Sequence, residues 1–85
     1  MEKKKPKILI IEDSPTEAKA LEIGLNKHGY ELFFATSGED GLDIANKEAI
    51  DLVLLDIELP GIDGFEVCKR LKENEKTKSI FVIIL

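Results

Sequence analysis

Four apolar runs interrupt an otherwise polar chain and give it its main pattern. Ile, Leu, Val and Phe dominate these runs, which end at polar or turn-forming residues. Continuous apolar runs of this length predict strands buried on both faces, as in a parallel sheet. Phe33 and Phe34 are adjacent and point to opposite faces, and we expect both to pack. The predicted strands cover residues 7–12, 30–36, 51–55 and 80–85.

Helical spacing and capping residues mark the segments between the runs. Ser14 as N-cap, Pro15 at the first helical position and Glu17 at the third predict one helix start. Asp63 as N-cap and Glu66 at the third helical position predict another. The predicted helices cover residues 15–27, 39–47 and 64–73, with a turn at 37–38 and a polar linker at 74–79.

Apolar residues at helical spacing predict which helix faces pack on the sheet. These residues are Ala18, Leu21, Leu25, Leu42, Ala45, Val67, Cys68 and Leu71. We expect Cys68 to be a small buried apolar residue and not a reactive thiol. Because strands and helices alternate, we predict an α/β fold with right-handed crossovers and one parallel sheet.

Length and composition limit the class of protein. The chain has 85 residues, which suffices for one domain, residues 1–85. Acidic residues outnumber basic ones by 17 to 12, which argues against nucleic-acid contact by this segment. A single cysteine suits a reducing compartment. The charged lead-in has no apolar stretch typical of a signal peptide, and no run has membrane-spanning length. We therefore expect a cytoplasmic protein without membrane contact.

Acidic residues directly follow two of the apolar runs. Glu12 and Asp13 follow the first run, and Asp56 follows the third. Pro60 and Gly61 then predict a loop. Parallel strands end at the same edge of a sheet, and ligands of open α/β sheets bind at that edge. We therefore expect these three carboxylates to lie together.

Crowded carboxylates repel one another unless a cation lies between them. Oxygen ligands suit a hard cation such as Mg²⁺, which usually binds one or two carboxylates together with waters and substrate phosphate oxygens. The residues therefore predict a Mg²⁺ site at the sheet edge that handles a phosphoryl group.

Two segments resemble the receiver domain of two-component response regulators. They are IIEDS (residues 10–14) and LLDIELPGIDGFEVC (residues 54–68), and the resemblance extends over residues 7–85. The resemblance implies a flavodoxin-like parallel sheet with flanking helices and strand order 2-1-3-4-5. The present chain would supply the first four strands and three helices of that fold, without the final helix, strand and helix.

The same resemblance implies roles for individual residues. Asp56 would accept the phosphoryl group, and Asp13 would bind Mg²⁺ directly. Glu12 would bind it directly or through water, and the backbone carbonyl of Glu58 would be a further ligand. The donor would be a sensor histidine kinase or a phosphotransfer protein. The domain would be a signalling phosphoacceptor that at most catalyses its own phosphorylation and dephosphorylation. Its output domain or effector is not specified by these residues.

The last apolar run raises a separate question. In the family, a Ser or Thr, a Lys and an aromatic residue that serve the phosphoryl site follow the fourth strand, whereas this sequence ends at Leu85. We expect an incomplete receiver domain, either a fragment of a longer chain or an incomplete record. The alternative is that a second copy covers residues 80–85, because an uncovered edge strand invites pairing with another chain.

Two other functions compete with phosphotransfer. The first is a receiver-like interaction module that is not phosphorylated. The second is a phosphohydrolase of the haloacid dehalogenase type, in which an Asp nucleophile also follows a strand. The residues after Asp56 lack the second Asp and the Thr or Val of that family. A dinucleotide-binding domain is set aside, because the first strand-to-helix turn, EDSPTE, has no glycine and its carboxylates would repel a pyrophosphate.

Overall fold

Strand and helix alternate along the chain in the predicted order. The computed structural model describes residues 5–85, so the first four residues of the charged lead-in lie outside it. No helix within this described part is both long enough and apolar enough to cross a membrane. The elements are β1 (Lys7–Ile11), α1 (Pro15–Asn26), β2 (Glu31–Ala35), α2 (Gly38–Lys47), β3 (Leu52–Leu55), α3 (Gly64–Glu73) and β4 (Phe81–Ile84).

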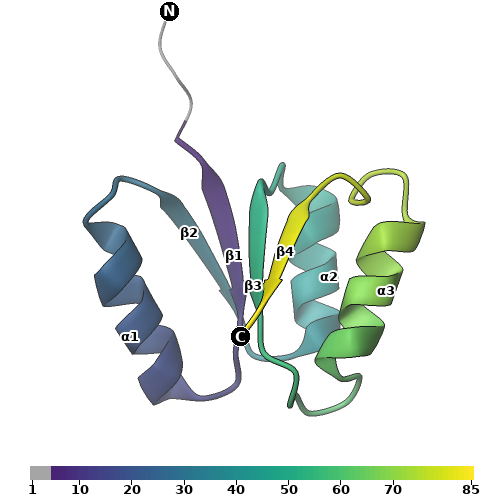
Figure 1. The fold of residues 1–85 in the computed structure, drawn as a ribbon, viewed down its shortest axis with the longest axis horizontal. Coiled ribbons are helices and arrows are strands. Elements are labelled where there is room, and N and C mark those ends of the chain that lie inside the picture. The colour runs from purple at the N-terminus through teal and green to yellow at the C-terminus, as the bar shows by residue number, and fades with distance from the viewer. Residues whose placement is uncertain (1–4) are drawn as a thin grey trace, which may run out of the picture.

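The four strands form one parallel sheet in the order β2-β1-β3-β4. Figure 1 shows α1 on one face of the sheet and both α2 and α3 on the other. β1 lies in the middle and pairs with β2 on one side and β3 on the other. This arrangement confirms the predicted flavodoxin-like fold with flanking helices. It places the carboxyl ends of all four strands at the same edge.

The main core lies on the face covered by α2 and α3. Parallel pairing aligns Leu9 with Val53 and Ile11 with Leu55, so these side chains form a continuous apolar surface on that face. Cys68 is partly buried against the same core, in keeping with the predicted apolar role. The buried residues of this core are Leu9, Ile11, Ala35, Ala45, Ile50, Val53, Leu55, Val67, Leu71 and Ile80.

The opposite face carries a smaller core under α1. Leu21 and Leu25 pack there, as their helical spacing predicts, against a cluster that contains Ile8, Ile10 and Leu54. No residue of α1 is fully buried. A single helix therefore covers one face of a four-stranded sheet, and the flanks of that face stay open.

The two outer strands of the sheet, β2 and β4, differ from the predictions made from the sequence. Phe33 packs against the main core, but Phe34 is 41% exposed, so the prediction that both pack is wrong for Phe34. The final apolar run is not a buried strand either, since Phe81 is 77% exposed. Phe34 lies on β2 and Phe81 on β4, the two outer strands of the sheet, where each strand has a strand partner on one side only within the described residues.

The start of α2 differs from the prediction, and the linker after α3 is not wholly exposed. Gly38 is the first residue of α2 and not part of a turn, because Ser37 is the N-cap and its Oγ accepts a hydrogen bond from the Asp40 N–H at 3.2 Å. The predicted polar linker contains the buried Thr77, whose Oγ1 donates to the Leu71 carbonyl at 2.7 Å. That bond satisfies a carbonyl near the C-terminus of α3.

Close packing of α2 on β1 depends on Gly41. A Cβ at this position would lie 2.8 Å from Ile11 Cγ1, which is inside van der Waals contact. We expect Gly41→Ala to lower the free energy of unfolding by about 1–2 kcal/mol, because overpacking outweighs the gain in helix propensity. Urea denaturation measures the change.

Gly24→Ala in α1 is the matched control for this test. No atom lies within 4 Å of a Cβ built there, so alanine should stabilise α1 by up to about 1 kcal/mol. Equal stabilisation by the two substitutions would contradict the close packing of α2 on β1.

Candidate metal centre

The pairing of β1 with β3 continues one residue past the strand ends. Ile11 and Leu55 are register partners, so Glu12 and Asp56 leave the sheet side by side. The Asp56 N–H donates to the Ile11 carbonyl at 3.0 Å, and the Glu12 N–H donates to the Ala35 carbonyl at 3.0 Å. Both acidic residues are therefore fixed by backbone hydrogen bonds at the carboxyl edge of the sheet.

The structure brings three of the residues singled out in the sequence together. One carboxylate oxygen from each of Glu12, Asp13 and Asp56 lies within 4.8 Å of the other two. Glu12 is only 4% exposed, Asp56 is half-buried and Asp13 is exposed. This all-oxygen donor set, open to solvent on one side, fits a hard cation such as Mg²⁺.

Residues 57–63 form an ordered loop beside the three carboxylates. Gly61 has φ +75°, a conformation that L side chains rarely adopt. The Ile62 N–H donates to Glu39 Oε2 at 3.4 Å, which attaches the loop to α2. Sequence reasoning missed this role of Glu39, because a residue at a helix start gives no sign of a contact 23 positions away.

Gly64 allows α3 to begin directly against the backbone of Asp56. A Cβ on Gly64 would lie 2.5 Å from the Asp56 carbonyl oxygen and 2.8 Å from Ile57 Cα. The Gly64 N–H donates to the Ile57 carbonyl at 2.9 Å, and Asp63 is the predicted N-cap, accepting from the Glu66 N–H at 2.9 Å. Glycine at this position therefore permits the backbone path that follows Asp56.

A hollow of about 830 Å³ opens in front of the three carboxylates. Glu58 is exposed and lines this hollow, on the same loop as Pro60. The lining also contains Asp63 and Glu17 and no basic residue. A hollow with this lining has a strongly negative potential, which favours cations.

Burial raises the pKa of Glu12 above its ordinary value of 4.5. The Ser14 N–H, which donates to Glu12 Oε1 at 3.0 Å, partly opposes this shift of the pKa. The negative charges of Asp56 and Glu17 add to it. Without a cation, the folded chain therefore holds a buried carboxyl group in an environment that disfavours its ionised form.

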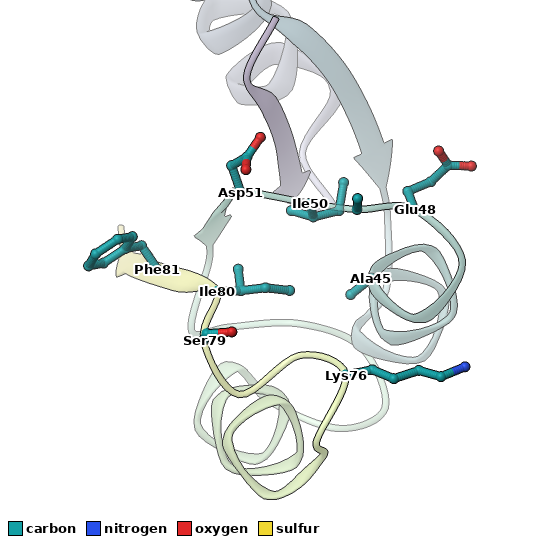
Figure 2. A pocket seen from close by; sticks show the side chains of 9 residues that line it. Ala45, Glu48, Ile50, Asp51, Lys76, Ser79, Ile80 and Phe81 are labelled. Atoms are coloured by element: carbon teal, nitrogen blue, oxygen red, sulfur yellow. The ribbon is translucent and has the colours of Figure 1, made fainter. Parts of the chain in front are cut away.

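A second hollow, of about 410 Å³, lies at the opposite edge of the sheet, where β3 and β4 begin. Figure 2 shows the apolar side chains of Ala45, Ile50 and Ile80 directed toward its interior, whereas the charged ends of Glu48 and Lys76 point away. Asp51 and Ser79 also line it, but the one group of side chains among the described residues that could hold a metal ion lies elsewhere, at Glu12, Asp13 and Asp56. The chemistry-bearing residues lie at the carboxyl edge.

Comparison with known proteins assigns the family. The sequence profile of the response regulator receiver domain matches residues 8–85, and the chain belongs to this family of signalling domains. Protein PilH of Pseudomonas aeruginosa is 43% identical over 79 residues, which cover 93% of this chain and 65% of that protein. Transcriptional regulatory protein AfsQ1 of Streptomyces coelicolor is 43% identical over 77 residues, covering 91% of this chain and 34% of that protein.

Solved structures agree with the fold. A response regulator of Chloroflexus aurantiacus superposes with a TM-score of 0.92 and 38% identity, over 95% of this chain and 66% of that one. The receiver domain of the sensor histidine kinase PA1611 of Pseudomonas aeruginosa, which has a magnesium ion in its active-site cleft, has a TM-score of 0.90 and 25% identity, over 95% and 66%. The family assignment replaces the haloacid dehalogenase hypothesis. The chain spans from about a third to about two thirds of the curated relatives' length.

The raised pKa of Glu12 predicts how stability changes with pH in the absence of metal. The folded chain binds the Glu12 proton more tightly than the unfolded chain does, so protonation of Glu12 stabilises the fold. This contribution to the free energy of unfolding is complete below pH 4.5 and is lost as the pH rises through the folded-state pKa. Glu12→Gln removes the ionisation. We therefore expect the variant to gain unfolding free energy relative to the wild type from pH 4.5 toward pH 7, measured by denaturation in EDTA.

Glu31→Gln is the control, because it removes an exposed carboxylate at the start of β2, at the amino end of the parallel strands. Its stability should follow the wild-type pH dependence. Parallel pH profiles for wild type and Glu12→Gln would show that burial of Glu12 does not affect folding.

Proposed function

We propose that this domain accepts a phosphoryl group on Asp56 in a Mg²⁺-dependent step of two-component signalling. The observation that carries the proposal is the meeting of three carboxylates within 4.8 Å at the carboxyl edge of the sheet. Asp56 is the half-buried member, beside both the cluster and the open hollow. A nucleophile needs this combination of fixed position and access.

In the proposed reaction, one Asp56 carboxylate oxygen attacks phosphorus of a phosphohistidine. The new O–P bond forms as the P–N bond breaks, and the imidazole nitrogen keeps the electron pair of that bond. Glu12, Asp13, Asp56 and the backbone carbonyl of Glu58 would hold Mg²⁺, which when bound neutralises negative charge on the phosphoryl oxygens. Attack of water on the acyl phosphate then releases inorganic phosphate and restores the Asp56 carboxylate.

The backbone around Asp56 and the charges of the hollow support this chemistry. Backbone hydrogen bonds and the close approach of Gly64 hold the Asp56 backbone, so its carboxylate does not have to be positioned during each reaction. Acidic residues around the hollow favour the approach of a cation. The domain would then catalyse its own phosphorylation and dephosphorylation and nothing beyond them.

We further propose that residues 1–85 belong to a single receiver-like domain, incomplete at its C-terminus, that lies in the cytoplasm. The donor would be a sensor histidine kinase or a phosphotransfer protein, and the effector is left open. The match to response regulators supports a donor of this kind. The net charge of −5 supports a segment that makes no contact with nucleic acid.

Incubation with acetyl phosphate and Mg²⁺ tests the phosphotransfer. We expect an adduct of one phosphoryl group in the intact mass, dependent on Mg²⁺ and lost in Asp56→Asn, because asparagine lacks the nucleophilic carboxylate. Asp43→Asn removes an exposed carboxylate of α2 and should keep the adduct. Absence of an adduct here, with the fold intact by circular dichroism, but formation of one on a chain extended past Leu85 would mean that these residues are a truncated receiver domain. Absence of an adduct on both chains would reject phosphotransfer and favour the interaction module.

The free edge of the sheet supports a second role, in self-association. β4 pairs with β3 alone among the described strands, so one side of its backbone has no strand partner. Phe81, Ile83 and Leu85 are 77%, 51% and 50% exposed, and residues 81–85 contain no charge and no proline to oppose pairing. As the alternative to a following strand of a longer chain, we propose that the β4 edge of one copy pairs with the β4 edge of a second copy.

Sedimentation velocity over a range of concentrations tests this pairing. We expect reversible dimers of the wild type and weaker association of Ile83→Lys, because a charge on an edge strand disfavours strand addition. Ile23→Lys places the same charge at a 55% exposed position of α1, away from β4, and should leave association unchanged. A wild type that stays monomeric at every concentration would refute the pairing.

A further inference from the structure

Glu17 is the third residue of α1, where a glutamate usually accepts a hydrogen bond from the N-cap backbone, but in this structure the N-cap N–H donates to another residue. In a capping box, the glutamate at the third helical position accepts a hydrogen bond from the backbone N–H of the N-cap. Here the Ser14 N–H donates to Glu12 Oε1 at 3.0 Å. The other half of the box is present, since the Glu17 N–H donates to Ser14 Oγ at 3.3 Å. The cap therefore fixes the backbone of Glu17 and leaves its carboxylate available.

That carboxylate lies beside the candidate metal centre. Glu17 lines the hollow in front of Asp56, and it also lines a neighbouring hollow of about 460 Å³ between α1 and Leu85 that contains Glu12 and Asp56. The negative charge of Glu17 is one of the causes that raise the pKa of Glu12. Glu17 thus lines the same hollows as Glu12 and Asp56, although it was singled out in the sequence only as a helix-start residue.

No basic side chain neutralises Glu17 within residues 5–85. Its helix neighbour Glu22 pairs with Lys19 at 3.2 Å, and elsewhere Glu66 pairs with Arg70 at 2.9 Å. The remaining ion pairs of the described residues are Lys7 with Glu48 and Lys78 with Glu75. The charge of Glu17 therefore acts on the hollow without an opposing charge nearby.

We propose that Glu17 is a fourth acidic residue of the phosphoacceptor site, which strengthens Mg²⁺ binding and disfavours free anionic phosphodonors. The inference rests on the proposed function of Asp56. The Glu17 charge is expected to raise the affinity for Mg²⁺ and to lower the rate of phosphorylation by a small anion. A negative charge at the mouth of the hollow attracts a divalent cation and repels a small anion such as acetyl phosphate.

Glu17→Gln separates this role from a structural one. The substitution removes the charge and keeps the shape, and the backbone N–H at position 17 can still donate to Ser14 Oγ. Titration calorimetry should show the Mg²⁺ dissociation constant rising about two- to five-fold, as expected for an exposed charge interaction. At saturating Mg²⁺, the rate of phosphorylation by acetyl phosphate should rise by about the same factor. Both effects should weaken as the ionic strength increases.

Two variants serve as controls. Glu22→Gln makes the same change on α1 beside Lys19 and outside both hollows, and it should leave both quantities at wild-type values. Glu17→Asp keeps the charge and should stay closer to the wild type than Glu17→Gln in both measurements.

The outcomes are distinct. Weaker Mg²⁺ binding together with faster phosphorylation supports the proposal. A fall in both binding and rate would mean that Glu17 only maintains the structure of the site, and an unchanged Mg²⁺ affinity would exclude its contribution; either result overturns the proposal. If the wild type forms no adduct, the proposed function of Asp56 fails, and the Mg²⁺ comparison alone decides whether Glu17 belongs to the cation site.

Discussion

The in-register parallel pairing of β1 with β3 is the constraint on which the site depends. Because Ile11 is paired with Leu55, the next residue on each strand is acidic, and the two acids leave the sheet as neighbours. The hydrogen bond from the Asp56 N–H to the Ile11 carbonyl, at 3.0 Å, carries this register past the strand ends. A slip of one residue would turn the apolar side chains of β3 to the opposite faces and separate Asp56 from Glu12. The packing of the core thus fixes the position of the acids.

Small residues bring the helices close enough to support that edge. Gly41 lets α2 lie against Ile11, immediately before Glu12, and Gly64 lets α3 begin against the Asp56 backbone. Glu39 on α2 holds the intervening loop through the Ile62 N–H. Two helices therefore pack against the backbone on either side of the acidic cluster, α2 at Ile11 and α3 at Asp56. The site also carries an electrostatic cost, because burial and the neighbouring carboxylates disfavour the ionised form of Glu12. Perturbed ionisation of this kind is common at functional sites.

The two faces of the sheet are covered unequally, and its two ends carry different kinds of side chain. The face under α2 and α3 holds the larger core, whereas the face under α1 is covered by a single helix and leaves Phe34 and Phe81 exposed at the two edges. Acidic groups gather around the hollow at the carboxyl edge, whereas Ala45, Ile50 and Ile80 point into a hollow at the amino edge whose lining also contains Glu48, Asp51, Lys76 and Ser79. The receiver family assignment fits this division, with phosphoryl chemistry proposed at one edge and contacts with other chains at the strand and helix surfaces.

The sequence by itself determined the element order, the parallel sheet and the positions of Glu12, Asp13 and Asp56 at strand ends, because apolar runs, capping residues and turn residues act over a few positions. It did not determine how well each face is covered, so Phe34 and Phe81 were expected to pack and are exposed. Nor did it reveal the contact of Glu39 with the loop, the carboxylate of Glu17 beside Glu12, or the close approaches at Gly41 and Gly64. These features depend on segments distant in sequence, and only the tertiary structure brings such segments together.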